Sequence, residues 1–190
     1  TGKFHGEFWN KKKDGTHFLV RISLTAIKNA SGEIKRFLAI ATDITDTRKA
    51  EERIQHLAHF HPLTDLPNRE LLASRIDLTV IMSKMDKAPM AVICVNLDRF
   101  KTLNDAFGHP FGDVVLKTLS ASYRESFNDK VIIAHPGSDE FFLVIPDCPP
   151  DEATRQAVIL QKITGQPRKI QGRDLRMSAS IGIAVFPVHG

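Results

Sequence analysis

The sequence lacks any hydrophobic run long enough to span a membrane, since a spanning helix needs about eighteen or more consecutive apolar residues. Its beginning, TGKFHGEFWN, also lacks the basic-then-apolar order of a secretory signal. With 42% hydrophobic and 25% charged residues, the composition is that of an ordinary globular protein. We therefore expect a soluble, cytoplasmic segment of a longer protein, which leaves open a membrane tether elsewhere in the full-length chain.

Cysteine is scarce as well. Cys94 lies in an apolar run, and Cys148 precedes two prolines. Two cysteines in such different settings do not suggest a disulfide framework, and this favours a reducing compartment.

Positive charge is unevenly distributed. Residues 1–60 hold eleven Lys and Arg against seven Asp and Glu, whereas residues 61–190 hold fifteen of each, which indicates two modules. The three lysines at 11–13 precede Asp14-Gly15 and are typical of a solvated hairpin turn. Because no basic-aromatic interleaving or helix-turn-helix pattern accompanies them, we do not predict nucleic-acid binding.

The first 45 residues are predicted to form an antiparallel meander. Strands are expected at 4–10, 17–28 and 34–44, with Asp14-Gly15 and Ser31-Gly32 as the turns. Three strands without a covering element leave one apolar face exposed, so this segment is part of a larger domain.

A helical linker is predicted over residues 46–60. Asp46-Thr47 can cap a helix, and Ala50, Ile54, Leu57 and Ala58 follow at helical spacing. This narrow apolar stripe suits a two-stranded coiled coil, and packing on the helix's own domain is an equal alternative.

Residues 61–190 are predicted to form an α+β domain. Helices are expected at 68–84, 112–126 and 151–164, and strands at 90–97, 131–134, 141–145, 168–170 and 175–186. The order β-α-β-β-α-β, with an extra late hairpin, is that of a ferredoxin-like fold.

Four sequence motifs carry a family resemblance. They are HPLTDLPNR at 61–69, VNLDRFKTLNDAFGHPFGD at 95–113, HPGSDEFF at 135–142 and SASIGIAVFP at 178–187. In this order they resemble the GGDEF domain, a nucleotide-cyclase fold, over about residues 57–190. GEFWNKKKDG and Asp43-Ile44-Thr45 resemble the last strands of a PAS sensor domain. The resemblance implies that the GGDEF domain is truncated here before its last helix.

The resemblance implies chemistry on two GTP molecules, which are joined into cyclic di-GMP with Mg²⁺ (or Mn²⁺) held by carboxylates. Asp139 and Glu140 are implied as catalytic residues, with Asp139 also a metal ligand. The other metal position is Asn96, a neutral amide and weak ligand where the family has Asp. The backbone of Leu97 and the carboxylate of Asp98 are auxiliary candidates.

The signature hairpin departs from the family as well. Gly137 is kept for the nucleotide, but Ser138 stands in place of the second Gly, where a positive φ and close backbone approach favour glycine. His135 replaces the usual Arg. We expect Asn96 and Ser138 to impair catalysis and metal to bind weakly, if at all.

The nucleotide-binding positions are kept. By the resemblance, Asn104 and Asp113 read the guanine edge, although helix capping is an alternative use for both. Arg99, Phe100 and Lys101 fall at the phosphates. The product-inhibition motif R-x-x-D is replaced by NDKV at 128–131, so feedback binding is not expected.

The sequence therefore favours a degenerate GGDEF domain that binds GTP or another guanine nucleotide in bacterial cyclic di-GMP signalling. It would regulate an attached output domain, with an EAL phosphodiesterase domain expected downstream, and form a homodimer through the linker. An active diguanylate cyclase and a relay module that binds no nucleotide are the alternatives. His56, His59 and His61 are interpreted as surface residues and not as a metal cluster.

Overall fold

The computed structural model describes residues 2–189. The chain folds into two compact units, Thr1–His56 and Leu57–Gly190. No helix of residues 2–189 has the length and apolar character required to cross a membrane.

The first unit holds a three-stranded antiparallel sheet in the order β1-β2-β3, which confirms the predicted meander. Its strands are β1 (Lys3–Lys11), β2 (His17–Lys28) and β3 (Ile34–Asp43). Large apolar side chains remain exposed on this sheet, and the register places Phe4, Phe8 and Phe37 together on one face and Trp9 and Ile40 on the other. The predicted uncovered apolar face is therefore present within this unit.

Helix α1 (Thr45–His59) begins directly after β3. The Leu19 N–H donates to Thr45 Oγ1 at 2.8 Å, and the Ile44 N–H donates to the Leu19 carbonyl at 2.9 Å, so the start of α1 is tied to β2. No residue of α1 is buried, and Ile54 is 68% exposed. The helix thus keeps its apolar stripe open.

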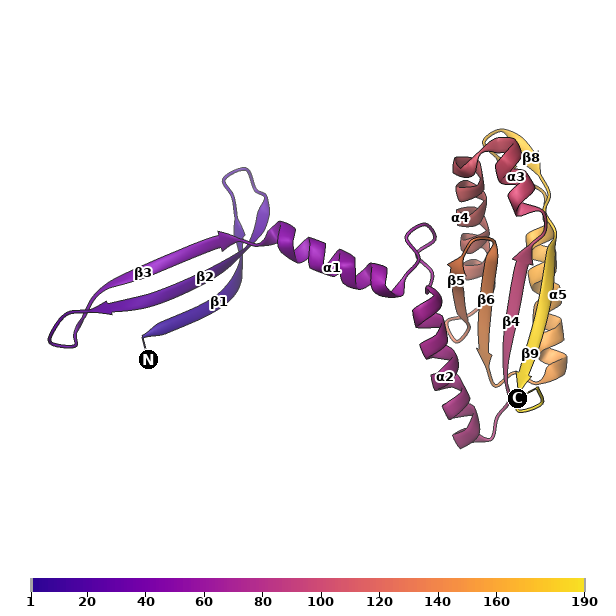
Figure 1. The fold of residues 1–190 in the computed structure, drawn as a ribbon, viewed down its shortest axis with the longest axis horizontal. Coiled ribbons are helices and arrows are strands. Elements are labelled where there is room, and N and C mark those ends of the chain that lie inside the picture. The colour runs from indigo at the N-terminus through magenta and orange to yellow at the C-terminus, as the bar shows by residue number, and fades with distance from the viewer. Residues whose placement is uncertain (1, 190) are drawn as a thin grey trace. The chain divides into compact units, whose positions relative to one another are not determined.

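The second unit has a four-stranded antiparallel sheet in the order β5-β6-β4-β9, which confirms the ferredoxin-like arrangement (Figure 1). In chain order its elements are α2 (Arg69–Asp86), β4 (Met90–Leu97), α3 (Phe100–Phe107), α4 (His109–Ser126), β5 (Ile132–Gly137), β6 (Glu140–Pro146), α5 (Pro150–Gly165), β7 (Arg168–Ile170), β8 (Arg173–Leu175) and β9 (Ala179–Phe186).

Two predictions about this unit were wrong. The sequence analysis predicted no helix over 100–107, yet α3 lies there, and only Phe100 of its eight residues is buried. Phe100, Leu103 and Phe107 do lie at helical spacing, but a helix of about two turns is shorter than the stretch over which such spacing is read. The strand predicted at 175–186 is divided into β8 and β9, because β8 turns back on β7 through Gln171 and Gly172, which both have positive φ.

Alternation along β4 divides the core between two layers. Ala91, Ile93, Val95 and Leu97 point into the larger core with α4 and α5, while Met90 and Val92 face the smaller core under α2. The apolar run of β4 is therefore buried on both faces, as expected for a central strand.

Tyr123 of α4 is the largest fully buried side chain of this core. Its hydroxyl donates to Thr164 Oγ1 at 2.7 Å, since the Thr164 hydroxyl itself donates to the Leu160 carbonyl. Its ring meets Phe141 edge-on at a centroid distance of 5.3 Å. Tyr123 thereby links α4, α5 and the signature hairpin.

We predict that Tyr123→Phe lowers the free energy of unfolding by about 1 kcal/mol, because it removes one buried hydrogen bond and leaves the ring contacts intact. Tyr123→Ala should cost about 3–5 kcal/mol through the cavity it leaves. Urea unfolding of both variants measures the difference. Equal losses of unfolding free energy in the two variants would show that the ring contacts contribute nothing to stability.

Candidate functional site

The signature hairpin connects β5 to β6 and is tied to the end of β4. The Leu97 N–H donates to the Asp139 carbonyl at 3.0 Å. At the turn Ser138 has a φ of 58°, the left-handed conformation that favours glycine. Its hydroxyl donates to the Asp139 carboxylate at 2.9 Å. Ser138 thus adds backbone strain at the turn, and its hydroxyl occupies one carboxylate oxygen of Asp139.

His135 is fully buried beneath this turn. Its Nε2 lies 3.2 Å from the Ser138 carbonyl, which can only accept, so Nε2 carries the proton. The Thr64 hydroxyl then donates to Nδ1 at 3.1 Å. The ring stacks on Phe141 at 4.6 Å and contacts the ring of His61 at 4.1 Å. A neutral histidine therefore joins the hairpin to the segment before α2.

The pKa of His135 is lowered to about 4, mainly by burial and also by the nearby His61, while its hydrogen bond to the Ser138 carbonyl opposes the shift. Burial also lowers the pKa of His61, and the Asp113 charge opposes this. The two rings lie close together in their neutral forms. If both were protonated, their positive charges would repel each other.

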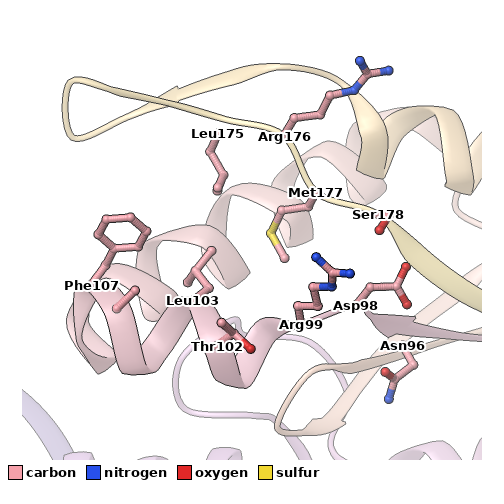
Figure 2. A pocket seen from close by; sticks show the side chains of 11 residues that line it. Asn96, Asp98, Arg99, Thr102, Leu103, Phe107, Leu175, Arg176, Met177 and Ser178 are labelled. Carbon is pink, nitrogen blue, oxygen red and sulfur yellow. The ribbon is translucent and has the colours of Figure 1, made fainter.

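One cavity, of about 950 Å³, opens between the end of β4, α3 and the segment before β9 (Figure 2). Asn96, Asp98 and Arg99 lie on its wall. The Ser180 hydroxyl donates to the Asp98 carboxylate at 2.8 Å, and hydrogen bonds from Ser178 and Ser180 lower the pKa of Asp98. In Figure 2 the Asn96 amide points away from this carboxylate.

A second cavity, of about 570 Å³, opens between α3, α4, the hairpin turn and the segment before α2. Its polar lining comes from His61, Lys101, Asn104, Asp105, His109, Asp113, His135, Ser138 and Asp139, and its apolar lining from Leu63, Phe100 and Leu116. It brings together one lysine, three carboxylates, an amide and an apolar wall, and its many acceptors suit a ligand ring that presents hydrogen-bond donors.

Asn104 is the most informative residue of the second cavity. Its Oδ1 is buried and finds no hydrogen-bond partner within residues 2–189. Gly112 makes room for it, because a Cβ there would overlap this oxygen. A buried acceptor without a donor costs about 1–3 kcal/mol. The oxygen is therefore suited to accept a hydrogen bond from a ligand after the amide rotates.

The two cavities separate the residues that the sequence analysis singled out. Phe100, Lys101, Asn104, Asp113 and Asp139 share the second cavity. Asn96, Asp98 and Arg99 line the first, and Gly137 and Glu140 line neither.

Other lining residues were missed by sequence analysis. His61, interpreted as a surface residue, is half-buried in the second cavity beside His135. Gly112 was missed as well, although its place in the GHPFGD motif is a signal for close packing. No sequence signal paired His61 with His135, because 74 positions separate them.

Comparison with known families identifies the class. The family model described as "Diguanylate cyclase, GGDEF domain" matches residues 58–190, and the chain belongs to this family. A PAS domain model matches residues 1–46.

The relatives are signalling proteins. The bifunctional diguanylate cyclase/cyclic di-GMP phosphodiesterase MucR of Pseudomonas aeruginosa is 38% identical over 146 residues, which cover 77% of this chain and 21% of MucR. The cyclic di-GMP phosphodiesterase PdeR of Escherichia coli is 33% identical over 165 residues, which cover 86% of this chain and 25% of PdeR. The chain thus spans about a quarter or less of these relatives.

Solved structures agree in fold. The GGDEF domain of TpbB from Pseudomonas aeruginosa matches with a TM-score of 0.66 and 30% identity, over 70% of this chain and 78% of that one. A sensory box/GGDEF family protein from Caulobacter crescentus matches with a TM-score of 0.65 and 30% identity, over 70% and 86% of the two chains.

The GGDEF family implies a divalent metal, and of the two candidate metal positions in this chain one is the neutral amide of Asn96 and the other is the carboxylate of Asp139. Within residues 2–189, no three Asp, Glu, His or Cys side chains gather closely enough to hold an ion. Asn96 brings no charge, and Asp98 already accepts hydrogen bonds on the wall of the other cavity. Asp139 is left as the carboxylate at the hairpin turn.

The pKa of His135 predicts a pH dependence of stability. The folded unit takes up this proton near pH 4, whereas the unfolded chain takes it up near pH 6.5. The free energy of unfolding therefore falls as the pH drops from 6.5 to 4, by at most about 3 kcal/mol.

Urea unfolding across this range should show a shallower slope for His135→Gln than for the unchanged chain. His109→Gln, at an exposed position of the same unit, should leave the slope unchanged. Parallel curves for all three proteins would contradict the assignment of this slope to His135.

Proposed function

We propose that this GGDEF domain binds GTP, or another guanine nucleotide, in the second cavity and acts as a regulatory module of cyclic di-GMP signalling with little cyclase activity of its own. The observation that carries the proposal is the buried, unpaired Oδ1 of Asn104 beside Asp113 in one cavity. Guanine offers donors for both residues.

The hydrogen-bonding edge of guanine matches these two side chains. The Asp113 carboxylate can accept from N1–H and from one hydrogen of the exocyclic amine. The second amine hydrogen then reaches Asn104 Oδ1, while the Asn104 amide donates to the ring nitrogen N3. Adenine lacks this amine, so the same pair of residues discriminates against ATP.

The phosphate end of the cavity supports an anionic ligand. Lys101 lies in the first turn of α3 and lines the same cavity as Asn104. An ammonium group at a helix N-terminus, together with free backbone N–H groups of the first turn, attracts phosphate. The phosphates and the base would thus contact successive turns of the short helix α3.

Weak cyclase activity follows from the charge at the metal position. Joining two GTP molecules builds negative charge on phosphate oxygens, which a divalent cation neutralises when anionic ligands hold it. Asn96 supplies an amide instead of a carboxylate, and Ser138 adds a side chain and strain to the turn. Base recognition would therefore remain while catalysis is lost.

A site that binds GTP but turns it over slowly can still regulate an attached domain. The names of MucR and PdeR include cyclic di-GMP phosphodiesterase activity. We propose that this chain precedes an EAL phosphodiesterase domain and that GTP binding regulates that domain. Pairing of α1 with a second copy, through the exposed Ile54 and Leu57, would transmit changes in the PAS segment.

Nucleotide binding is predicted to depend on Asp113 far more than on Asp98. Asp113→Ala should weaken GTP binding about ten- to hundredfold, because buried guanine donors lose their acceptor. Asp98→Ala, on the wall of the other cavity, should change the affinity by less than about threefold. Inosine triphosphate, which lacks the exocyclic amine, should also bind more weakly than GTP.

Titration calorimetry of each variant, with circular dichroism to confirm folding, measures these affinities. Equal effects of the two substitutions would place the guanine elsewhere. No heat with GTP for the folded, unchanged chain would support a relay module that binds no nucleotide.

Catalysis is predicted to be restored by two substitutions. The full-length protein should make little or no cyclic di-GMP from GTP and Mg²⁺. Asn96→Asp combined with Ser138→Gly should raise the rate, by up to about a thousandfold if several kcal/mol of transition-state stabilisation return.

The single variant Ser138→Gly is the control that separates turn strain from charge. Product formation is measured by chromatography of the reaction mixture. Wild-type turnover equal to that of the double variant would establish the alternative function, an active diguanylate cyclase.

A further inference from the structure

Helix α2 is apolar on two opposite faces. Its inner face packs Leu72, Ile76 and Val80 against the sheet. Its outer face carries four large apolar side chains at the helical spacing i, i+3, i+4 and i+7, and we call them the outer stripe. They are Leu78, Ile81, Met82 and Met85, which are 50, 54, 60 and 77% exposed.

The outer stripe is unusual for a helix on the surface of a soluble domain. A single exposed apolar residue is ordinary, but four at this spacing form a continuous ridge along two turns of helix. Contiguous exposed apolar surface of this kind marks an interaction site. Nothing in the proposed nucleotide site uses it, because none of the four residues lines the second cavity.

Charged residues flank the outer stripe in a self-complementary pattern. Asp77 and Lys84 lie two turns apart on one flank, and Arg75 and Asp86 lie about three turns apart on the other. When two copies of α2 run antiparallel and cross between positions 80 and 81, Asp77 faces the partner's Lys84. In the same register Arg75 faces the partner's Asp86.

We propose that the outer stripe pairs with the outer stripe of a second copy of this chain, as an antiparallel two-fold helix pair. In a parallel two-fold pair the two different flanks would face each other, so that Asp77 and the partner's Arg75 would meet about two residues out of level. The antiparallel register instead gives four opposite-charge pairs. These pairs are level with one another, which favours a second copy as the partner and the antiparallel orientation.

The same register also matches the shape of the surface. The Ile81 side chains of the two copies meet near the two-fold axis. Met82 comes level with the partner's Thr79, which lines a cavity of about 290 Å³. That cavity is lined by Leu78 and Met82 of α2 and by Met90, Ile132 and Pro146 of the sheet. A flexible methionine is well suited to fill such an irregular apolar hole.

Lys84 must move for this pairing. Its Nζ lies 5.6 Å from the centroid of the Phe186 ring, a contact worth little at an exposed site. Rotation of its long side chain toward the partner's Asp77 therefore costs little free energy. The helix is only about 27 Å long, so the interface is small and its dissociation constant is expected on the order of tens of micromolar.

Sedimentation velocity over a concentration series tests the proposal. The chain should carry Ile54→Glu, which removes the apolar stripe of α1 and with it any pairing of the linker. We expect concentration-dependent dimers. Ile81→Asp should abolish them, and Val158→Asp, the matched substitution of an exposed aliphatic residue on α5, should leave them unchanged.

Charge exchange tests the register itself. Asp77→Lys or Lys84→Asp alone should weaken dimerisation about tenfold, since each places two like-charge contacts in the dimer. The double exchange should restore the affinity to within about threefold. Monomers up to about 1 mM, equal effects of Ile81→Asp and Val158→Asp, or no rescue by the double exchange would each overturn the proposal.

Discussion

The end of β4 is fixed by backbone hydrogen bonds on both sides, and the arrangement of the site depends on them. The Leu97 N–H donates to the Asp139 carbonyl of the hairpin, and the Asp98 N–H donates to the Ser178 carbonyl before β9, both at 3.0 Å. Because these groups lie next to buried core residues, the strand cannot slip without exposing that core. The side chains at 96, 98 and 139 therefore have fixed positions whatever residues occupy them.

On the proposed function, this rigidity explains how the metal half of the site can change while the base-binding half is kept. Replacing a carboxylate by the amide of Asn96 alters charge but not backbone geometry. The hairpin tolerates a neutral His135 because Thr64, Ser138 and Phe141 satisfy its hydrogen bonds and stack on its ring. The second cavity is formed mainly by α3 and α4, so Asn104 and Asp113 keep their places independently of these changes.

Much of this architecture could be predicted from the sequence, because periodicity reports burial directly. β4 was predicted over its full span, since a short apolar run with turn signals is typical of a central strand. α3 was not predicted, because it has only eight residues, so the helical spacing of Phe100, Leu103 and Phe107 is too short a pattern to stand out. The contact of His61 with His135 was also missed, since it arises from the tertiary fold alone.

The account is tested most directly by measuring the affinity of the chain for GTP twice, once with excess Mg²⁺ and once with a chelator. If guanine recognition is kept while the metal centre is incomplete, Mg²⁺ should change the dissociation constant by less than about threefold. Tightening by more than about tenfold in Mg²⁺ would show that Asn96, Asp98 and Asp139 still support a metal centre, and would contradict the account.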